Sequence, residues 1–270
     1  MEQATFDIFQ AYLKKSSGLI LTFDKVYLLE SRLTPLAREY QIPDLITMAN
    51  EVRKGTNPAL LKAIVDAMTT NETSFLRDGK PFDHFKKVML PDLIQRNAAT
   101  KKIRIWSAAC SSGQEPYTLA MLLKEEGTKL AGWQFEIIAT DLSNDILAKA
   151  KQGEYSQFEV QRGLPITLLM KYFAQKEDRW QIKPEIQSMV TFKPFNLLDD
   201  FRALGKFDIV FCRNVLIYFE SPTKKDVMER MRALGDKDLY MVLGGAETVI
   251  GLTDKWKPHP AASGVFIPNQ

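Results

Sequence analysis

The stretch SAACSSGQEPYTLAM, residues 107–121, decides the fold because it joins a short apolar run to a helical pattern. The run before it, IRIW at 103–106, has the character of a buried strand, and the residues after Glu115 have helical spacing. A strand, a tight turn and a helix in this order form the ligand-binding unit of parallel α/β sheets. Yet the turn holds one glycine, Gly113, where a dinucleotide fingerprint holds three.

The sequence beyond this stretch repeats the alternation of strand and helix. Three further apolar runs, at 134–140, 207–212 and 239–243, are separated by helical patterns. Such alternation predicts a parallel sheet with helices on both faces, which binds ligands beyond the carboxyl ends of its strands. Polar clusters follow the predicted strands at Ser111–Glu115, Asp141, Asn196 and Arg213–Asn214. We therefore expect one shared pocket at this edge.

Residues 1–70 differ, because they contain helical patterns and no β-alternation. An apolar stripe steps by three and four through Val26, Leu29, Leu33, Leu36 and Tyr40. We expect Asp24 to cap this helix and Pro35 to kink or split it. Residues 57–68 predict another helix, with Asn57 as its cap and Pro58 in its first turn. This part of the chain is predicted to be all-α.

An interruption at residues 152–195 is longer than one connecting helix needs. It contains a helical pattern, RGLPITLLMKYF, and then two runs with strand character, DRWQIK and SMVTFK. We expect a helix and a small antiparallel hairpin inserted in the sheet domain.

Composition narrows the class of protein. The net charge is only +3, and residues 1–75 hold slightly more acidic than basic side chains, which argues against a nucleic-acid partner. No apolar run reaches the ~18 residues of a membrane span, and the N-terminus does not resemble a signal peptide. Two cysteines, Cys110 and Cys212, are too few for a disulfide framework, which suits a reducing cytosol. Two histidines, His84 and His259, have no ligand-spaced companions, so no metal site is expected.

Two acidic residues at the predicted edge indicate the chemistry of the ligand. Glu115 has the wrong charge for a phosphate and suits a cationic or hydroxyl-rich ligand, although an acid also favours a helix N-terminus by itself. Asp141 ends a strand, where an acid commonly accepts hydrogen bonds from the ribose hydroxyls of an adenosine-type ligand. The alternative is that Asp141 or Ser143 caps the next helix.

Two other polar segments are candidates for function. TTNETSFLRD (69–78) joins the helical part to the sheet part, and its alternative role is helix capping. FCRNVLIYF (211–219) places Arg213 and Asn214 at a strand end and Tyr218 in an apolar setting. Taken alone, Tyr218 is more typical of a core aromatic with a satisfied hydroxyl than of a catalytic group.

Together these segments resemble one family, the chemotaxis receptor methyltransferases of the CheR family. The resemblance rests on TTNETSFLRD, ACSSGQEPYTLAM, ATDLS, FNLL and FCRNVLIYF, which follow one another over residues 69–219. It implies an α/β fold: a Rossmann-like class I methyltransferase sheet with an inserted small antiparallel β-subdomain, preceded by an all-α N-terminal domain. It also implies that S-adenosylmethionine donates methyl groups to glutamate side chains on the cytoplasmic helices of chemoreceptors. The products are glutamyl methyl esters and S-adenosylhomocysteine.

The resemblance also implies roles for individual residues. The cofactor would be bound by Asn71, Thr73, Arg77, Gly113, Glu115, Asp141, Asn196, Leu197, Arg213 and Asn214. Arg77 and Tyr218 would handle the substrate carboxylate. Arg32 and Arg38 would approach the acidic receptor surface, unless these two arginines are simply solvated. A sulfonium cofactor without phosphates explains the opening loop, since it requires no phosphate-binding glycines and tolerates an acid.

The implied organisation is an all-α receptor-docking domain at 1–68, a linker at 69–85 that contributes to the cofactor site, and a cofactor-binding domain at 86–270 with the insert at 152–195. We expect a cytoplasmic monomer that acts on chemoreceptors, with no nucleic acid and no membrane insertion.

The sequence departs from the family in two places. Some relatives bind a receptor pentapeptide through a glycine-containing loop of the inserted hairpin, whereas FAQKEDRWQIK (173–183) has no glycine, so independence of that peptide is expected. In LGGAETV (243–249), Ala246 stands where the family usually has part of a histidine–serine pair before the glutamate.

Three other functions stay open at this point. A protein of the same fold could bind the cofactor and regulate a partner without catalysing transfer. A nicotinamide-dependent dehydrogenase is disfavoured by the single-glycine loop and the lack of a placed catalytic His or Lys. A methyltransferase for small molecules or RNA is the third, and the near-neutral helical half disfavours RNA.

Overall fold

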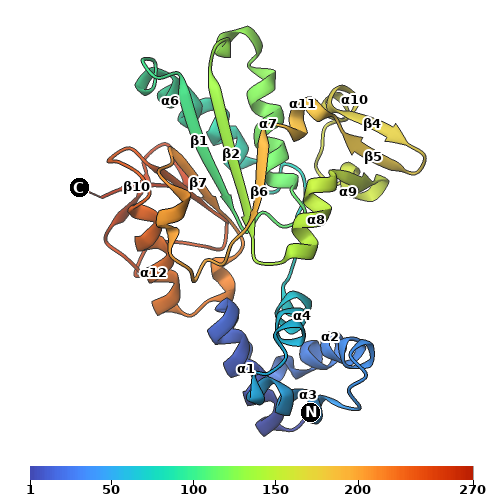
Figure 1. Ribbon diagram of the computed structural model, residues 1–270. Helices are drawn as coiled ribbons and strands as arrows, with labels where there is room; N and C mark the ends of the chain where they lie inside the picture. The colour runs from blue at the N-terminus through green and yellow to red at the C-terminus, as the bar shows by residue number, and fades with distance from the viewer. Residues whose placement is uncertain (270) are drawn as a thin grey trace. The chain divides into compact units, whose positions relative to one another are not determined.

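The computed structural model describes residues 1–269, and the chain divides into two compact units (Figure 1). One unit contains Met1–Thr70 together with Tyr218–Thr223, and the other contains Asn71–Ile217 together with Lys224–Gln270. Within residues 1–269, no helix is both long and apolar enough to cross a membrane.

The first unit is built from the helices α1 (Gln3–Ser17), α2 (Val26–Glu39), α3 (Leu45–Lys54) and α4 (Pro58–Met68). Helix α1 packs against α3, and α2 packs against α4. The side chains that fill the space between them are fully buried: Phe9, Leu13, Leu29, Leu33, Met48, Leu60 and Ile64. Asn57 caps α4 as expected, because its side chain accepts a hydrogen bond from the Leu60 N–H, and Pro58 occupies the first turn.

For α2, the expected cap is wrong, and the expected kink or split at Pro35 does not take the form of a split. Asp24 does not cap the helix: it lies in a 3₁₀ turn, Phe23–Lys25, that leads directly into α2, and no side chain caps the helix start. Pro35 does not split the helix, which is continuous from Val26 to Glu39. Pro35 and Ser31 are both at least partly accessible, so water can solvate the Ser31 carbonyl that has lost its usual N–H partner.

The second unit is built on a sheet with the strand order β6-β2-β1-β7-β8-β10-β9. Its strands are β1 (Lys102–Ala108), β2 (Gln134–Asp141), β6 (Val190–Pro194), β7 (Ile209–Cys212), β8 (Tyr240–Leu243), β9 (Trp256–His259) and β10 (Ala262–Pro268). Strands β6 to β8 in this order are parallel, and β10 and β9 add antiparallel pairs at one edge. The strands expected from the four apolar runs are confirmed.

The register of the parallel strands sets the position of the site. Ala108 pairs with both Thr140 and Cys212, and Asp141 pairs with Pro194. The carboxyl ends of β1, β2, β6 and β7 therefore finish at the same level of the sheet, as expected for a ligand-binding edge.

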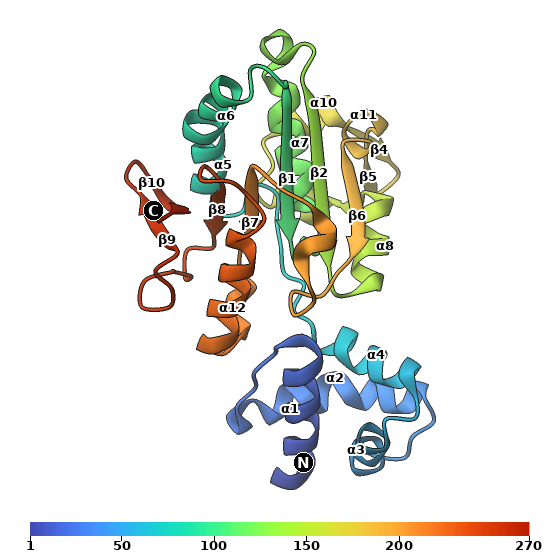
Figure 2. The same cartoon turned by 60° about the vertical axis from the view of Figure 1, so that its left-hand side comes forward.

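Side chains alternate across β1 and form two buried layers. Ile103 and Ile105 face a core shared with α5 (Lys80–His84), α6 (Leu90–Arg96) and α7 (Gln114–Glu125), and α7 lies behind β1 and β2 in Figure 2. On the other face, Trp106 contacts the rings of Phe195, Phe201 and Phe207. The indole N–H of Trp106 donates to the Thr140 hydroxyl at 2.9 Å, which satisfies this buried donor.

The insert contains a small antiparallel sheet, β3-β5-β4 (Figure 1). Its elements are β3 (Glu154–Ser156), α9 (Gln157–Gln161), α10 (Ile166–Tyr172), β4 (Phe173–Lys176), β5 (Arg179–Ile182) and α11 (Pro184–Gln187). The expected helix and hairpin are present, but the expectation that SMVTFK belongs to the hairpin is wrong. It forms β6 of the main sheet, parallel to β2, because Val190 pairs with Ile137 and is buried in the main core.

The insert packs tightly on the segment that precedes the sheet. The Phe75 ring lies edge-on to Tyr155 of β3 at 5.0 Å and to Phe173 of β4 at 5.6 Å between ring centroids. Gly163 has a φ of +96°, and a Cβ at this position would lie 2.2 Å from the Phe75 carbonyl oxygen. The chain therefore requires glycine here for two reasons, the left-handed backbone and the close approach of another main chain.

We expect Gly163→Ala to lower the free energy of unfolding by about 3 kcal/mol, because it adds a main-chain clash to the cost of the left-handed backbone. Gly132→Ala is the matched control: Gly132 has a φ of +80° but nothing within 4 Å of its Cβ position. The control is expected to cost only about 1 kcal/mol. Urea unfolding of both variants measures the difference, and equal losses would show that Phe75 can move away freely.

Candidate functional site

The loop between β1 and α7 is shaped by residues with a left-handed backbone. Ala109, Ser111 and Gly113 have φ of 56°, 52° and 92°. The Cys110 N–H donates to the Thr140 carbonyl at 2.9 Å, which ties the loop to the end of β2. A Cβ at Gly113 would lie 3.2 Å from atoms of Ala150, Tyr117 and Tyr155, so packing against protein is one reason for this glycine.

Asp141 organises the loop from the end of β2. It is 6% exposed, and its Oδ2 accepts the Ser111 N–H at 2.8 Å while its Oδ1 accepts the Ser143 N–H at 3.1 Å. Ser143, and not Asp141, is the N-cap of α8 (Asn144–Gln152), because its hydroxyl accepts the Ile146 N–H. The capping role is therefore filled by Ser143, and the Asp141 carboxylate is directed to the loop at the sheet edge.

Glu115 and Arg213 form a buried ion pair across the same edge. The Arg213 Nη1 donates to Glu115 Oε2 at 2.8 Å, and the Ser107 hydroxyl donates to Glu115 Oε1 at 2.7 Å. Arg213 lies over the Phe82 ring, and within residues 1–269 its buried Nε finds no acceptor. Each Glu115 oxygen keeps a further lone pair for another donor.

Residues 71–79, which we call the strap, cross this edge. The Ser111 hydroxyl donates to the Asn71 carbonyl at 2.8 Å, and the Arg213 Nη2 donates to the Arg77 carbonyl at 2.7 Å and to Asp78 Oδ2 at 2.8 Å. The Arg77 side chain donates within its own segment, to the Glu72 carbonyl at 2.7 Å. Thr73 is half-buried in the strap. The strap is therefore held by the Asn71 and Arg77 carbonyls and by the Asp78 carboxylate, and the hydrogen bond of the Arg77 guanidinium within the strap is exposed.

The segments that follow β6 and β7 complete the edge. The Phe195 N–H donates to the Asp141 carbonyl at 2.9 Å, and Asn196 Oδ1 accepts the Leu198 N–H at 3.0 Å. Leu197 is buried, and its carbonyl accepts from Arg230. Asn214 follows Arg213 with a left-handed φ of 59°. The structure thus brings most of the expected cofactor residues to one edge of the sheet.

Tyr218, Arg32 and Arg38 belong to the first unit. The Tyr218 carbonyl accepts the Ile20 N–H at 2.9 Å. Arg32 Nη1 donates to the Met68 and Thr69 carbonyls at 2.9 and 3.0 Å, so its guanidinium caps the end of α4. Arg38 is exposed in the last turn of α2.

Neither cysteine is a suitable nucleophile. Burial raises the pKa of the Cys110 thiol well above its ordinary value, and the Asp141 and Glu115 carboxylates raise it further. Burial likewise raises the pKa of Cys212, with smaller contributions from carboxylates nearby. Both thiols therefore stay protonated near neutral pH, whereas nucleophilic attack requires the thiolate. In the described residues, no group of three His, Cys, Asp or Glu side chains is arranged to hold a metal ion.

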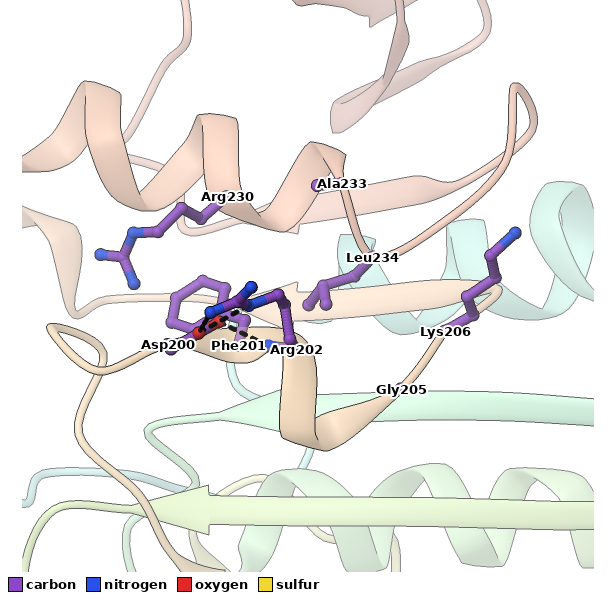
Figure 3. Close-up of a pocket in the computed structure, with 8 residues that line it drawn as sticks. All are labelled: Asp200, Phe201, Arg202, Gly205, Lys206, Arg230, Ala233 and Leu234. Carbon is purple, nitrogen blue, oxygen red and sulfur yellow. Dashed lines mark hydrogen bonds and ion pairs between the residues drawn. The ribbon is translucent and has the colours of Figure 1, made fainter.

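A separate hollow of about 390 Å³ lies outside this edge (Figure 3). It is lined by Asp200, Phe201, Arg202, Gly205, Lys206, Arg230, Ala233 and Leu234, none of which is an expected site residue. Its cationic side chains are paired with acids, Arg202 with Asp200, Lys206 with Asp236, and Arg230 with Asp226. The hollow therefore offers little uncompensated charge to a ligand.

Two residues of the site could not be recognised from the sequence. Asp78 ends the TTNETSFLRD motif without an expected role, although it accepts from Arg213. Glu247 follows the departure from the family at Ala246, and its carboxylate accepts several main-chain N–H groups at the end of β7. A contact between residues more than 30 positions apart leaves no local signal in the sequence.

The chemistry of this edge defines a class of protein. The carboxylates of Asp141 and Glu115 are buried, and Glu115 pairs with the buried Arg213. Such a set of carboxylates suits a ligand with hydroxyl donors and positive charge and does not suit a phosphate. S-adenosylmethionine has ribose hydroxyls, an amino group and a sulfonium, so the residues present fit it. The fold and this edge together are those of an S-adenosylmethionine-dependent methyltransferase.

Comparison with known families identifies the chain further. Residues 71–265 match the family model described as CheR methyltransferase, SAM binding domain, and residues 4–69 match the one described as CheR methyltransferase, all-alpha domain. The chain belongs to the CheR methyltransferase family. The family, the fold class and the cofactor expected from the motifs are thereby confirmed.

Curated relatives match almost the whole chain. Chemotaxis protein methyltransferase 1 of Pseudomonas aeruginosa is 42% identical over 267 residues, which cover 97% of this chain and 97% of that protein. Chemotaxis protein methyltransferase Cher2 of Pseudomonas putida is 41% identical over 265 residues, covering 97% and 96%. Chemotaxis protein methyltransferase 1 of Vibrio cholerae is 40% identical over 253 residues, covering 92% and 90%. The protein is therefore an S-adenosylmethionine-dependent methyltransferase of chemotaxis.

Proposed function

We propose that this enzyme transfers a methyl group from S-adenosylmethionine to glutamate side chains on the cytoplasmic helices of chemoreceptors. The products are glutamyl methyl esters and S-adenosylhomocysteine. The observation that carries the proposal is the pair of buried carboxylates, Glu115 and Asp141, at a sheet edge crossed by a strap whose Arg77 guanidinium is accessible. The relatives' role in chemotaxis supports receptors as the substrate.

The reaction requires positioning more than acid–base chemistry. A glutamate carboxyl has an ordinary pKa of about 4.3, so the nucleophile is already ionised near pH 7 and needs no general base. When bound, S-adenosylmethionine supplies the methyl group. We propose that Arg77 orients the substrate carboxylate by a forked hydrogen bond and that Tyr218 gives a neutral second contact. Too tight an ion pair would stabilise the ground state, whereas correct alignment lowers the barrier.

We further propose that the cofactor is bound by residues of the strap and the strand ends: Asn71, Thr73, Arg77, Gly113, Glu115, Asp141, Asn196, Leu197, Arg213 and Asn214. Asp141 would hold the ribose hydroxyls, and Asn196 and Leu197 would border the adenine. The all-α part, residues 1–68, would dock on receptors through Arg38 and, where its contacts with α4 permit, Arg32. The enzyme would act as a monomer in the cytoplasm.

The test is methyl transfer to membranes that contain chemoreceptors. Labelled S-adenosylmethionine is incubated with the enzyme and the membranes, and receptor peptides are then analysed by mass spectrometry. The proposal expects a gain of one methyl group on glutamate residues of the cytoplasmic helices. Binding of S-adenosylhomocysteine without any labelled receptor would instead favour a regulatory, non-catalytic role.

Receptor docking is expected to be independent of a C-terminal receptor pentapeptide. The hairpin β4–β5 turns through Glu177 and Asp178 only, and the segment 173–183 has no glycine. A short turn of this kind lacks the extended loop through which relatives would hold the peptide. Calorimetry with such a pentapeptide should show no binding at micromolar concentrations, and removing the pentapeptide from the receptor should leave methylation unchanged.

A further inference from the structure

One carboxylate accepts hydrogen bonds from five main-chain N–H groups, four after the end of β7 and one after the end of β8. Glu247 accepts hydrogen bonds from Asn214 at 2.8 Å, Val215 at 3.0 Å, Leu216 at 2.7 Å, Ile217 at 3.3 Å and Gly244 at 2.7 Å. Oε1 accepts from three of these groups and Oε2 from the other two.

The local backbone explains why the donors converge. Asn214 has a left-handed φ of 59°, and Leu216–Tyr218 form a 3₁₀ turn, so successive N–H groups from 214 to 217 point to one side. Such a concave run of N–H groups attracts an anion. Here the anion is part of the chain itself, and hydrogen bonds to a charged acceptor are stronger than those between neutral groups.

Gly244 leaves the space that this arrangement needs. A Cβ at Gly244 would lie 2.8 Å from Asn214 Nδ2, 2.8 Å from Glu247 Oε2 and 2.9 Å from the Asn214 N. Real Cβ contacts of this length do not occur without movement of a neighbour. The turn at Asn214 and the Glu247 carboxylate therefore pack together closely, and this packing requires glycine at position 244.

Arg213 links the Asn214 turn and Glu247 to the rest of the site. Arg213 directly precedes the turn and donates to Glu115, to the Arg77 carbonyl and to Asp78. A shift of the Asn214 turn would move the Arg213 main chain and so displace the side chain that makes these contacts. The left-handed Asn214 itself costs energy, so something must hold it in place.

We infer that Glu247 is a positioning residue that fixes the Arg213–Asn214 turn in the geometry required to bind the cofactor. The inference rests on the proposed assignment of Arg213 and Asn214 to the cofactor site. Glu247 acts through the main chain of the turn and does not itself touch the cofactor. The role does not depend on the histidine–serine pair that Ala246 replaces in part.

The experiment measures S-adenosylhomocysteine binding by calorimetry with the full-length chain. We expect Glu247→Gln to raise the Kd about tenfold or more, because an amide offers one acceptor oxygen and directs its NH₂ at N–H donors. Gly244→Ala should raise the Kd similarly by displacing the Glu247 carboxylate and Asn214. The control is Glu185→Gln, the same change on an exposed carboxylate of α11, which should leave the Kd unchanged.

The binding stoichiometry distinguishes positioning from simple support of the fold. A positioning role predicts a raised Kd with a stoichiometry near one, measured well below the melting temperature. If either folded variant binds with a Kd within twofold of wild type, the inference is wrong. If both variants have no folded fraction, or a lowered stoichiometry at unchanged Kd, the role is structural and the inference is also wrong. Failure of the wild type to methylate receptors would count against the proposed function alone, since binding is measured without receptor.

Discussion

Arg77→Ala is expected to reduce kcat for receptor methylation about 100-fold, whereas Tyr218→Phe should reduce it only a few-fold. In the proposed mechanism Arg77 fixes the direction of the substrate carboxylate, and misplacement of reacting atoms by about 1 Å can cost that factor. Tyr218 would give a single neutral contact, which is weaker than a forked contact with a guanidinium.

The structure indicates that the Arg77 side chain can be removed without loss of the contacts that hold the strap. The contact with Arg213 uses the Arg77 carbonyl, which alanine retains, and the side chain itself donates to the Glu72 carbonyl of its own segment. The melting temperature should therefore stay close to that of wild type. Arg77→Lys is the matched variant, because it keeps the charge and loses the fork, and it should recover only part of the rate. Equal turnover by wild type and Arg77→Ala would remove Arg77 from the mechanism.

Arg213→Met is expected to lower the free energy of unfolding by about 3–5 kcal/mol, because it leaves the Glu115 carboxylate buried without its partner. The Arg213 side chain is 2% exposed and that of Glu115 is 10% exposed, so water cannot easily replace the lost contact. The Arg77 carbonyl and Asp78 lose a donor in the same change.

Urea unfolding measures this loss, and a double variant tests its cause. Combining Glu115→Gln with Arg213→Met removes the stranded charge and should restore a large part of the stability. Arg202→Met serves as the control, because Arg202 pairs with Asp200 on the surface and its loss should have no measurable effect. If Arg213→Met and Arg202→Met behave alike, the buried pair does not stabilise the fold.

Features set by neighbours in the chain could be predicted from the sequence. The strands at 102–108 and 134–140 follow from runs of apolar residues, and the cap at Asn57 follows from its own side chain and Pro58. The polar residues after the strands could be placed at one edge, because parallel strands all end there. Family resemblance then supplied the cofactor, which composition alone could not have named.

Features set by distant contacts could not be predicted in this way. Pro35 normally ends a helix, and only its accessible position in the bundle makes the defect tolerable. Strand β6 has the same local pattern as a hairpin strand, and pairing with β2 decides its sheet. The sequence identifies Arg32 only as a basic residue on a helix, whereas in the structure it donates to carbonyls 36 and 37 positions away at the end of α4. The donors of Glu247 likewise become neighbours only after folding.

The packing of Phe75 between Tyr155 and Phe173 has a consequence for protein engineering. The hydroxyl of Tyr155 also donates to the Ser112 carbonyl in the loop after β1, at 2.8 Å. Replacing the whole insert with that of a homologue would thus disturb both the strap and the loop after β1, because Tyr155 contacts both. A graft confined to the turn between β4 and β5, Glu177 and Asp178, would change only the outer end of the hairpin. The ring contacts of Phe75 with Tyr155 and Phe173 would stay intact.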